Sequence, residues 1–249
     1  MAGHSKWANI QHRKKRQDAK RGKLFTKLIR EITVASRSGG QDPSANSRLR
    51  LAIDKALNSN MPKDTIDRAI KRGAGDQEGV NFEEIRYEGY GPSGVAVLVD
   101  CMTDNKNRSV AEIRHCFAKH GGNLGSSGCV AYLFHQTGIL SYTKNNDEEK
   151  ILDIATNSGA EDVNILDDGS IEVLVDPKYF MQLKEAMLSA NLIPDIDEVT
   201  YRAETATNLS ENDAISLFQL LDELEELDDV QNVYSNAEVD DDILDGIAN

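Results

Sequence analysis

The chain has 249 residues and a formal net charge of −14 at pH 7, and this length suggests two domains or three small ones. The total hides an asymmetry: the net charge is +12 over residues 1–75, −3 over residues 76–135 and −23 over residues 136–249. The average argues against a nucleic-acid partner, but a basic first third can hold a polyanion while the last third repels it.

Other classes of protein are excluded by the same sequence. Its longest apolar stretch, residues 94–102, is far shorter than the roughly 20 residues of a membrane-spanning helix. The N-terminus lacks the apolar segment of a signal peptide. Three cysteines without a Cys-x-x-Cys pair argue against a disulfide scaffold and a thiolate zinc site. We therefore expect a cytoplasmic protein with no membrane partner.

The first 75 residues predict a small bundle of three helices. Apolar side chains recur at helical spacing over residues 18–38, and Gly39-Gly40 ends that helix. Asp42-Pro43 predicts an N-cap with proline at the first position of a second helix. A third helix is predicted from just after Pro62 to Gly73. Helices joined by such short loops pack together as a bundle.

Cations are concentrated in the first of these helices and in the segment before it, where only Asp18 and Glu31 interrupt the run. A solvated helix face normally mixes charges of both signs. We therefore predict a phosphate-contacting surface, with a solvated face or docking onto the chain's own acidic third as alternatives. Trp7 is placed either to stack on a base or to pack in the bundle. The candidate nucleic-acid-binding residues are Lys6, Trp7, Arg13, Lys14, Lys15, Arg16, Lys20, Arg21, Lys23, Lys27 and Arg30.

Residues 76–135 predict an α+β unit. Two strands, at residues 84–89 and 95–102, pair across the turn at residues 91–94. The capping-box pattern that starts at Ser109 opens a helix that Gly121 ends. A further strand is predicted at residues 128–134.

The next segment, residues 136–205, predicts a second α+β unit of the ferredoxin-like βαββαβ type. The turn Asp168-Gly169 joins its middle strands, and Asp176-Pro177 caps its second helix. Its strands lack the aromatic and basic residues of an RNA-recognition sheet, which disfavours RNA readout there. The predicted strands cover residues 139–143, 162–166, 171–175 and 196–202, and the helices cover residues 148–158 and 177–191.

After this unit, a helix at residues 210–227 and a strand at residues 230–235 are too few elements to form a domain. We expect them to return and complete the sheet of the first α+β unit, so that the ferredoxin-like unit is inserted in it. The predicted domains are a basic tail and bundle (1–75), the first α+β domain (76–135 with 206–238), the inserted domain (136–205) and a solvated acidic tail (239–249).

Catalytic motifs are absent from the sequence. We find no phosphate loop ending in Gly-Lys-Ser/Thr, no His-Glu-x-x-His metal motif and no Gly-x-Ser-x-Gly nucleophile elbow. We therefore expect no enzyme, no cofactor and no metal site.

Several exact strings make the chain resemble the YebC/PmpR family, and the resemblance covers essentially its whole length. They are MAGHSKWAN at residues 1–9, KRGKLFTK at 20–27, NMPKD at 60–64, RAIK at 68–71, YEGYGP at 87–92 and TDNKNR at 103–108. The resemblance implies a helical bundle with two α+β domains, one inserted in the other. It also places the family's Met-Pro-Lys turn at Met61, Pro62 and Lys63, which adds Lys63 to the candidate residues.

The resemblance implies two functions for a non-enzymatic regulator of gene expression. Bacterial members are described as DNA-binding transcriptional regulators. Other relatives resemble mitochondrial translational activators of cytochrome c oxidase or factors that help ribosomes through difficult sequences. We expect DNA-binding transcriptional regulation, with an RNA- or ribosome-associated translation factor as the alternative. A third hypothesis is a small-ligand sensor in the ferredoxin-like domain.

Overall fold

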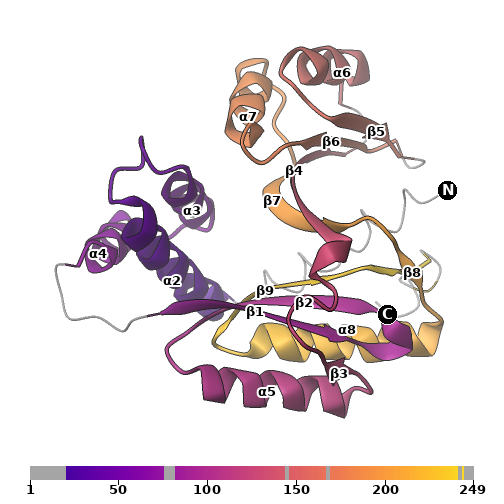
Figure 1. Cartoon of the computed structure of the whole chain (residues 1–249). Helices are drawn as coiled ribbons and strands as arrows, with labels where there is room; N and C mark the ends of the chain where they lie inside the picture. The colour runs from indigo at the N-terminus through magenta and orange to yellow at the C-terminus, as the bar shows by residue number, and fades with distance from the viewer. Residues whose placement is uncertain (1–20, 76–81, 144–145, 167–168, 241–242, 244–249) are drawn as a thin grey trace.

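The structure is a computed structural model that describes residues 21–75, 82–143, 146–166, 169–240 and 243 (Figure 1). The predicted fold class is confirmed: a three-helix bundle precedes two α+β units, and one of them interrupts the other. In Figure 1 the bundle lies beside the first α+β unit, and the inserted unit lies above both.

The bundle consists of α2 (Arg21–Gly39), α3 (Ser47–Asn58) and α4 (Lys63–Gly73) around a small apolar core. The predicted start of the second helix was wrong. Asp42 accepts the Ser44 N–H at 2.9 Å in a turn, and Asn46 is the N-cap, because its side chain accepts the Leu49 N–H at 3.0 Å. The helix therefore begins four residues after Pro43.

Gly73, at the end of α4, allows α2 and α4 to pack closely. A Cβ atom at this position would lie 2.3 Å from the Thr33 carbonyl oxygen, which no side chain can tolerate. Next to it, the Ser36 hydroxyl donates to the Ile70 carbonyl at 2.8 Å. The glycine that marks the end of the helix in the sequence is thus also a packing residue.

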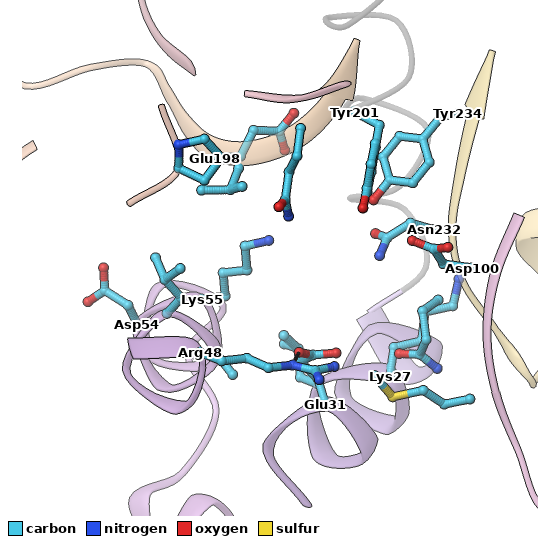
Figure 2. Close-up of a pocket in the computed structure, with 18 of the residues that line it drawn as sticks. Lys27, Glu31, Arg48, Asp54, Lys55, Asp100, Glu198, Tyr201, Asn232 and Tyr234 are labelled. Carbon is cyan, nitrogen blue, oxygen red and sulfur yellow. Dashed lines mark hydrogen bonds and ion pairs between the residues drawn. The ribbon is translucent and has the colours of Figure 1, made fainter. Parts of the chain in front are cut away.

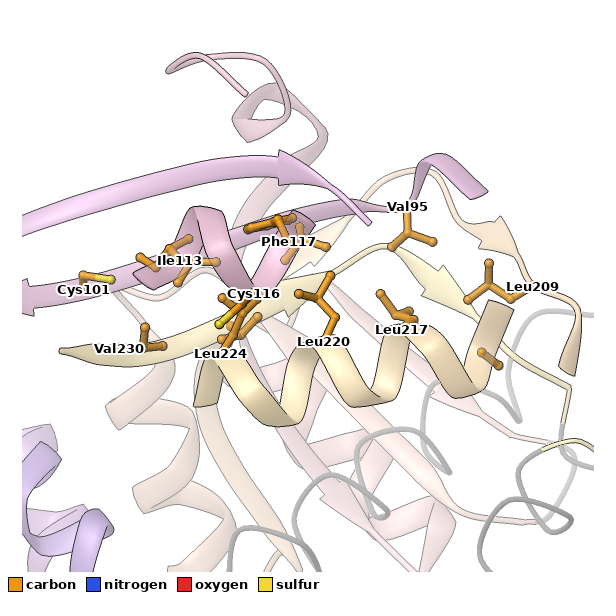
Figure 3. Close-up of a cluster of buried hydrophobic side chains, with 14 of the residues drawn as sticks. Val95, Cys101, Ile113, Cys116, Phe117, Leu209, Leu217, Leu220, Leu224 and Val230 are labelled. Carbon is orange, nitrogen blue, oxygen red and sulfur yellow. The ribbon is translucent and has the colours of Figure 1, made fainter. Parts of the chain in front are cut away.

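The first α+β unit has a sheet in the order β3-β1-β2-β9, with α5 and α8 on one face (Figures 1 and 3). Its core joins Ile113 and Phe117 of α5 to the leucines of α8. The predicted return of the helix and strand near the C-terminus is therefore confirmed. The elements are β1 (Glu83–Tyr90), β2 (Ala96–Thr103), α5 (Lys106–Lys119), β3 (Asn123–Leu124), α8 (Glu211–Glu226) and β9 (Val230–Ser235).

Two local predictions in this unit were wrong. The helix α5 begins at Lys106 after the N-cap Asn105, whose side chain accepts the Arg108 N–H. Ser109 is therefore a buried helix residue instead of a cap. Of the strand predicted at residues 128–134, only Phe134 lies in a strand, because the buried Glu88 carboxylate accepts the N–H groups of Gly128, Val130 and Ala131, which a ladder would need.

The inserted unit is the predicted βαββαβ fold, with strand order β5-β6-β4-β7. Its second helix begins three residues later than predicted, because the Asp176 carboxylate holds a turn by accepting the Lys178 N–H at 2.9 Å. The elements are β4 (Phe134–Tyr142), α6 (Glu148–Asn157), β5 (Asp162–Ile165), β6 (Ile171–Val175), α7 (Phe180–Ser189) and β7 (Ile196–Ala203).

A short parallel pair closes the chain, with β8 (Thr207–Asn208) against β10 (Ala237–Glu238). Val239 is fully buried and Ile243 packs against the same core, so the predicted acidic tail is anchored at its start. We propose that the domain boundaries lie near residues 75, 135 and 205, as the sequence predicts, because the chain passes there from one hydrophobic core to the next.

Candidate nucleic-acid interface

The predicted binding residues fall into three groups. Lys6, Trp7, Arg13, Lys14, Lys15, Arg16 and Lys20 lie outside the described residues. Arg21, Lys23, Lys27 and Arg30 lie on α2, and Lys63 opens α4. The structure therefore describes only the candidates on α2 and α4.

Two lysines of α2, Lys23 and Lys27, face the C-terminal end of α8. The Lys23 ammonium lies 2.8 Å from the Glu226 carboxylate, and the Lys27 ammonium donates to the Glu225 carbonyl at 3.1 Å. The last turn of α8 contains no basic residue of its own. Because carbonyl groups at a helix C-terminus carry partial negative charge, cations from α2 stabilise this end. These side chains thus contribute to docking of the bundle.

Arg30 reaches a buried carboxylate just after α8. Its guanidinium donates to Asp229 at 3.1 Å, while Arg108 of α5 donates to the other carboxylate oxygen at 2.7 Å. The hydroxyls of Thr103 and Ser109 donate to that second oxygen too, at 2.9 and 2.8 Å. Burial alone would raise the pKa of Asp229, but the donors from Arg108 and the hydroxyls lower it. Asp229 therefore joins the bundle to β2, α5 and β9.

The cations of α4 are arranged differently. Their side chains are exposed, and within the described part of the chain none of them pairs with a carboxylate. Lys63 was predicted from the family resemblance, but Arg68, Lys71 and Arg72 were missed as candidates. The spacing of these three residues, i, i+3 and i+4 along a helix, could have identified them, because it places them on one face.

A cleft with a volume of about 1000 Å³ separates the bundle from the two sheets (Figure 2). Most charges in its walls are paired. Arg48 of α3 contacts Glu31 at 2.8 Å and Glu84 at 2.7 Å. Lys184 of α7 is largely buried and contacts Asp54 of α3 at 2.6 Å, which ties the inserted unit to the bundle. No local pattern in the sequence predicts these long-range pairs.

Acid is expected to weaken the fold through Glu88 and Asp229. Burial opposes ionisation of Glu88, but its three backbone donors lower its pKa below the usual 4.5, and the pKa of Asp229 lies below 3.8. The unfolded chain therefore binds more protons, and stability decreases as the pH falls through about 4.5 and below.

Urea unfolding midpoints measured from pH 7 to pH 3 check this expectation. The Glu88→Gln variant should be less stable at pH 7, because its amide donor faces backbone donors, and its midpoint should change less with acid. Equal pH profiles for the two proteins would contradict it.

Among the described residues, no group of three or more His, Cys, Asp or Glu side chains is placed to hold a metal ion. The thiols of Cys101 and Cys116 are buried, and burial raises the pKa of Cys101 to about 12 and that of Cys116 to about 11. In the same described ranges, we find no helix with the length and apolarity that crossing a membrane requires.

Fold and site define an α+β multidomain protein that presents a basic helical bundle beside acidic α+β units. The chain belongs to the TACO1/YebC family, the YebC/PmpR family that its motifs resemble. A model of the TACO1/YebC N-terminal domain matches residues 5–76, and a model of the TACO1/YebC second and third domain matches residues 82–237.

Relatives and a solved structure agree with this assignment. A "probable transcriptional regulatory protein" of Methylococcus capsulatus is 61% identical over 244 residues, which is 98% of each chain. One of the same name from Coxiella burnetii is 61% identical over 98% of this chain and 100% of its own. The crystal structure of the conserved hypothetical protein Aq1575 of Aquifex aeolicus superposes with a TM-score of 0.79 at 46% identity, over 90% of this chain and 93% of that one.

Proposed function

We propose that this protein is a non-enzymatic, nucleic-acid-binding regulator of gene expression that contacts phosphate groups through its basic N-terminal unit. The observation that carries the proposal is the exposed face of α4, whose cations have no carboxylate partner in the described residues. Residues 1–75 add a net charge of +12. Exposed cations that are not paired with a carboxylate attract a polyanion without reading its sequence.

The acidic units limit how a nucleic acid approaches. Residues 136–249 carry a net charge of −23, and in Figure 1 the inserted unit lies at the top of the view, whereas α4 lies at the left of the bundle. A polyanion is repelled from that side and is directed to the bundle. Docking of Lys23 and Lys27 against α8 leaves α4 and the segment before α2 as the contact surface.

DNA-binding transcriptional regulation is the first form of this proposal, and the names of the relatives support it. Binding to RNA or to the ribosome in translation is the alternative. Phosphate contacts are common to both. Crosslinking in cells, followed by sequencing of the bound nucleic acid, separates them: enrichment of promoter DNA supports the first form, and enrichment of ribosomal or messenger RNA supports the second.

Replacing the four α4 cations (Lys63, Arg68, Lys71 and Arg72) by alanine is expected to weaken binding to all sequences. Each lost phosphate contact should reduce the slope of log affinity against log salt by about 0.9 on duplex DNA. Fluorescence anisotropy at several salt concentrations measures both quantities. Alanine at Lys119 of α5, an exposed lysine that contacts Glu223 at 2.8 Å and lies outside the cleft, is the control for a general loss of charge. An unchanged slope in the α4 variant would refute α4 as the contact surface.

A further inference from the structure

Some polar groups of the cleft have no partner among the described residues. Lys55 of α3 reaches into the cleft from the bundle, and Glu198 of β7 lies on the opposite wall (Figure 2). The side-chain amides of Gln136 and Asn232 are exposed, and within the described chain they take part in no hydrogen bond. The Nε2 group of Gln231, also in the lining, is buried without an acceptor. The cleft thus offers donors and acceptors that the fold itself does not use.

Aromatic rings stand beside these amides. The Tyr201 ring is held by the Arg86 guanidinium, 4.3 Å from its centroid, and by the Tyr234 ring, whose centroid is 5.2 Å away in an edge-to-face arrangement. Arg86 is itself fixed by Asp100 at 2.7 Å. Figure 2 shows Tyr201, Tyr234 and Asn232 together on the wall opposite α3. A rigid aromatic wall next to unused amides is thereby formed.

The balance of charge in the cleft indicates which kind of ligand the cleft can bind. Apart from Lys55, most of its cations are paired with carboxylates, as are Arg48, Arg86 and Lys184. A row of phosphates would meet these carboxylates and be repelled. An unpaired base is neutral and planar, and its edge needs both donors and acceptors, which amide side chains supply. The phosphate of the same nucleotide can pair with Lys55, on the wall that the basic bundle forms.

We propose that this cleft binds an unpaired nucleotide of a single-stranded nucleic acid, with the base at Tyr201, Gln136 and Asn232 and a phosphate at Lys55. This inference rests on the proposed function, and it adds that the protein prefers single strands to duplexes. Duplex segments are held by the bundle alone, because a paired base does not present its edge to the cleft.

The test uses the full-length protein, a fluorescent oligouridine and a duplex DNA of the same length. The double variant Gln136→Leu, Asn232→Leu should lose about tenfold in affinity for the oligouridine and keep its affinity for the duplex, since the net contribution of the amide hydrogen bonds that are lost corresponds to about this factor. Lys55→Ala should also reduce the affinity for the oligouridine more than the affinity for the duplex. Because these side chains are exposed and unpaired, the variants should fold, which circular dichroism checks.

Two controls separate this proposal from the proposed function. Asn212→Leu changes an exposed amide on α8, outside the cleft, and should alter neither affinity. The α4 alanine variant should bind both nucleic acids more weakly than the wild type. If the cleft variants bind both as the wild type does while the α4 variant is weakened, the cleft proposal is overturned and the function stands. If the wild-type protein binds neither, both fail.

Discussion

Replacing Asp229 by alanine is expected to lower the free energy of unfolding by about 3–5 kcal/mol, the range for breaking a buried, hydrogen-bonded charge pair. The side chain of Asp229 is only 3% exposed and accepts hydrogen bonds from Arg30, Arg108 and two hydroxyl groups. Its loss leaves the Arg30 guanidinium with backbone carbonyl acceptors only, and it leaves Arg108 with Asp104 as its remaining carboxylate partner. Since Arg30 belongs to the bundle, the variant should also weaken docking of the bundle.

Thermal and urea unfolding of the two proteins measure this effect. The matched control is Asp228→Ala, one residue earlier, where the carboxylate side chain is 79% exposed and its nearest cation, Lys23, is 4.0 Å away. An exposed pair of this kind contributes less than about 1 kcal/mol. Equal losses in the two variants would contradict the central role of Asp229.

The largest expected effect on binding comes from changing Arg13, Lys14, Lys15 and Arg16 to alanine. This is the densest group of cations in the chain. If all four contact phosphates, the salt slope on duplex DNA decreases by about 0.9 for each of them, and affinity at low salt decreases on the order of 100-fold. Because phosphate contacts do not read bases, the loss should be similar for every sequence tested.

The matched control for that variant is the pair Lys23→Ala, Lys27→Ala. These lysines carry the same charge but contact Glu226 and the Glu225 carbonyl in the folded chain. We expect a smaller change in salt slope and a measurable loss of stability. A slope change per residue equal to that of residues 13–16 would mean that the nucleic acid displaces the α8 contacts.

Local sequence signals were sufficient where short-range geometry decides the outcome. Gly73 ends a helix as predicted, and the helix predicted from residue 210 begins at Glu211 with Ser210 as its N-cap, because capping and helix termination depend on a few neighbouring residues. Local signals failed where a group far away in the chain changed the role of a residue. Ser109 fits a cap by pattern, yet its hydroxyl donates to Asp229, which is 120 residues away in the chain.

The same reason explains what was missed in the candidate site. A count of charges finds the basic third of the chain, but it does not show which cations are already paired. Lys23, Lys27 and Arg30 were predicted as part of the basic run, and the fold brings each of them against α8 or the residues that follow it. The α4 cations are fewer in the sequence but remain exposed.

The sequence by itself determined the α+β class, the order of the main helices and strands apart from the one predicted at residues 128–134, and the separation of charge between the two ends of the chain. Hydrophobic periodicity and composition are local properties, so they can be read directly. Only the tertiary structure decided which cations face solvent, where Asp229 is buried and which polar groups line the cleft. These depend on contacts between residues far apart in the chain, whose partners no local pattern specifies.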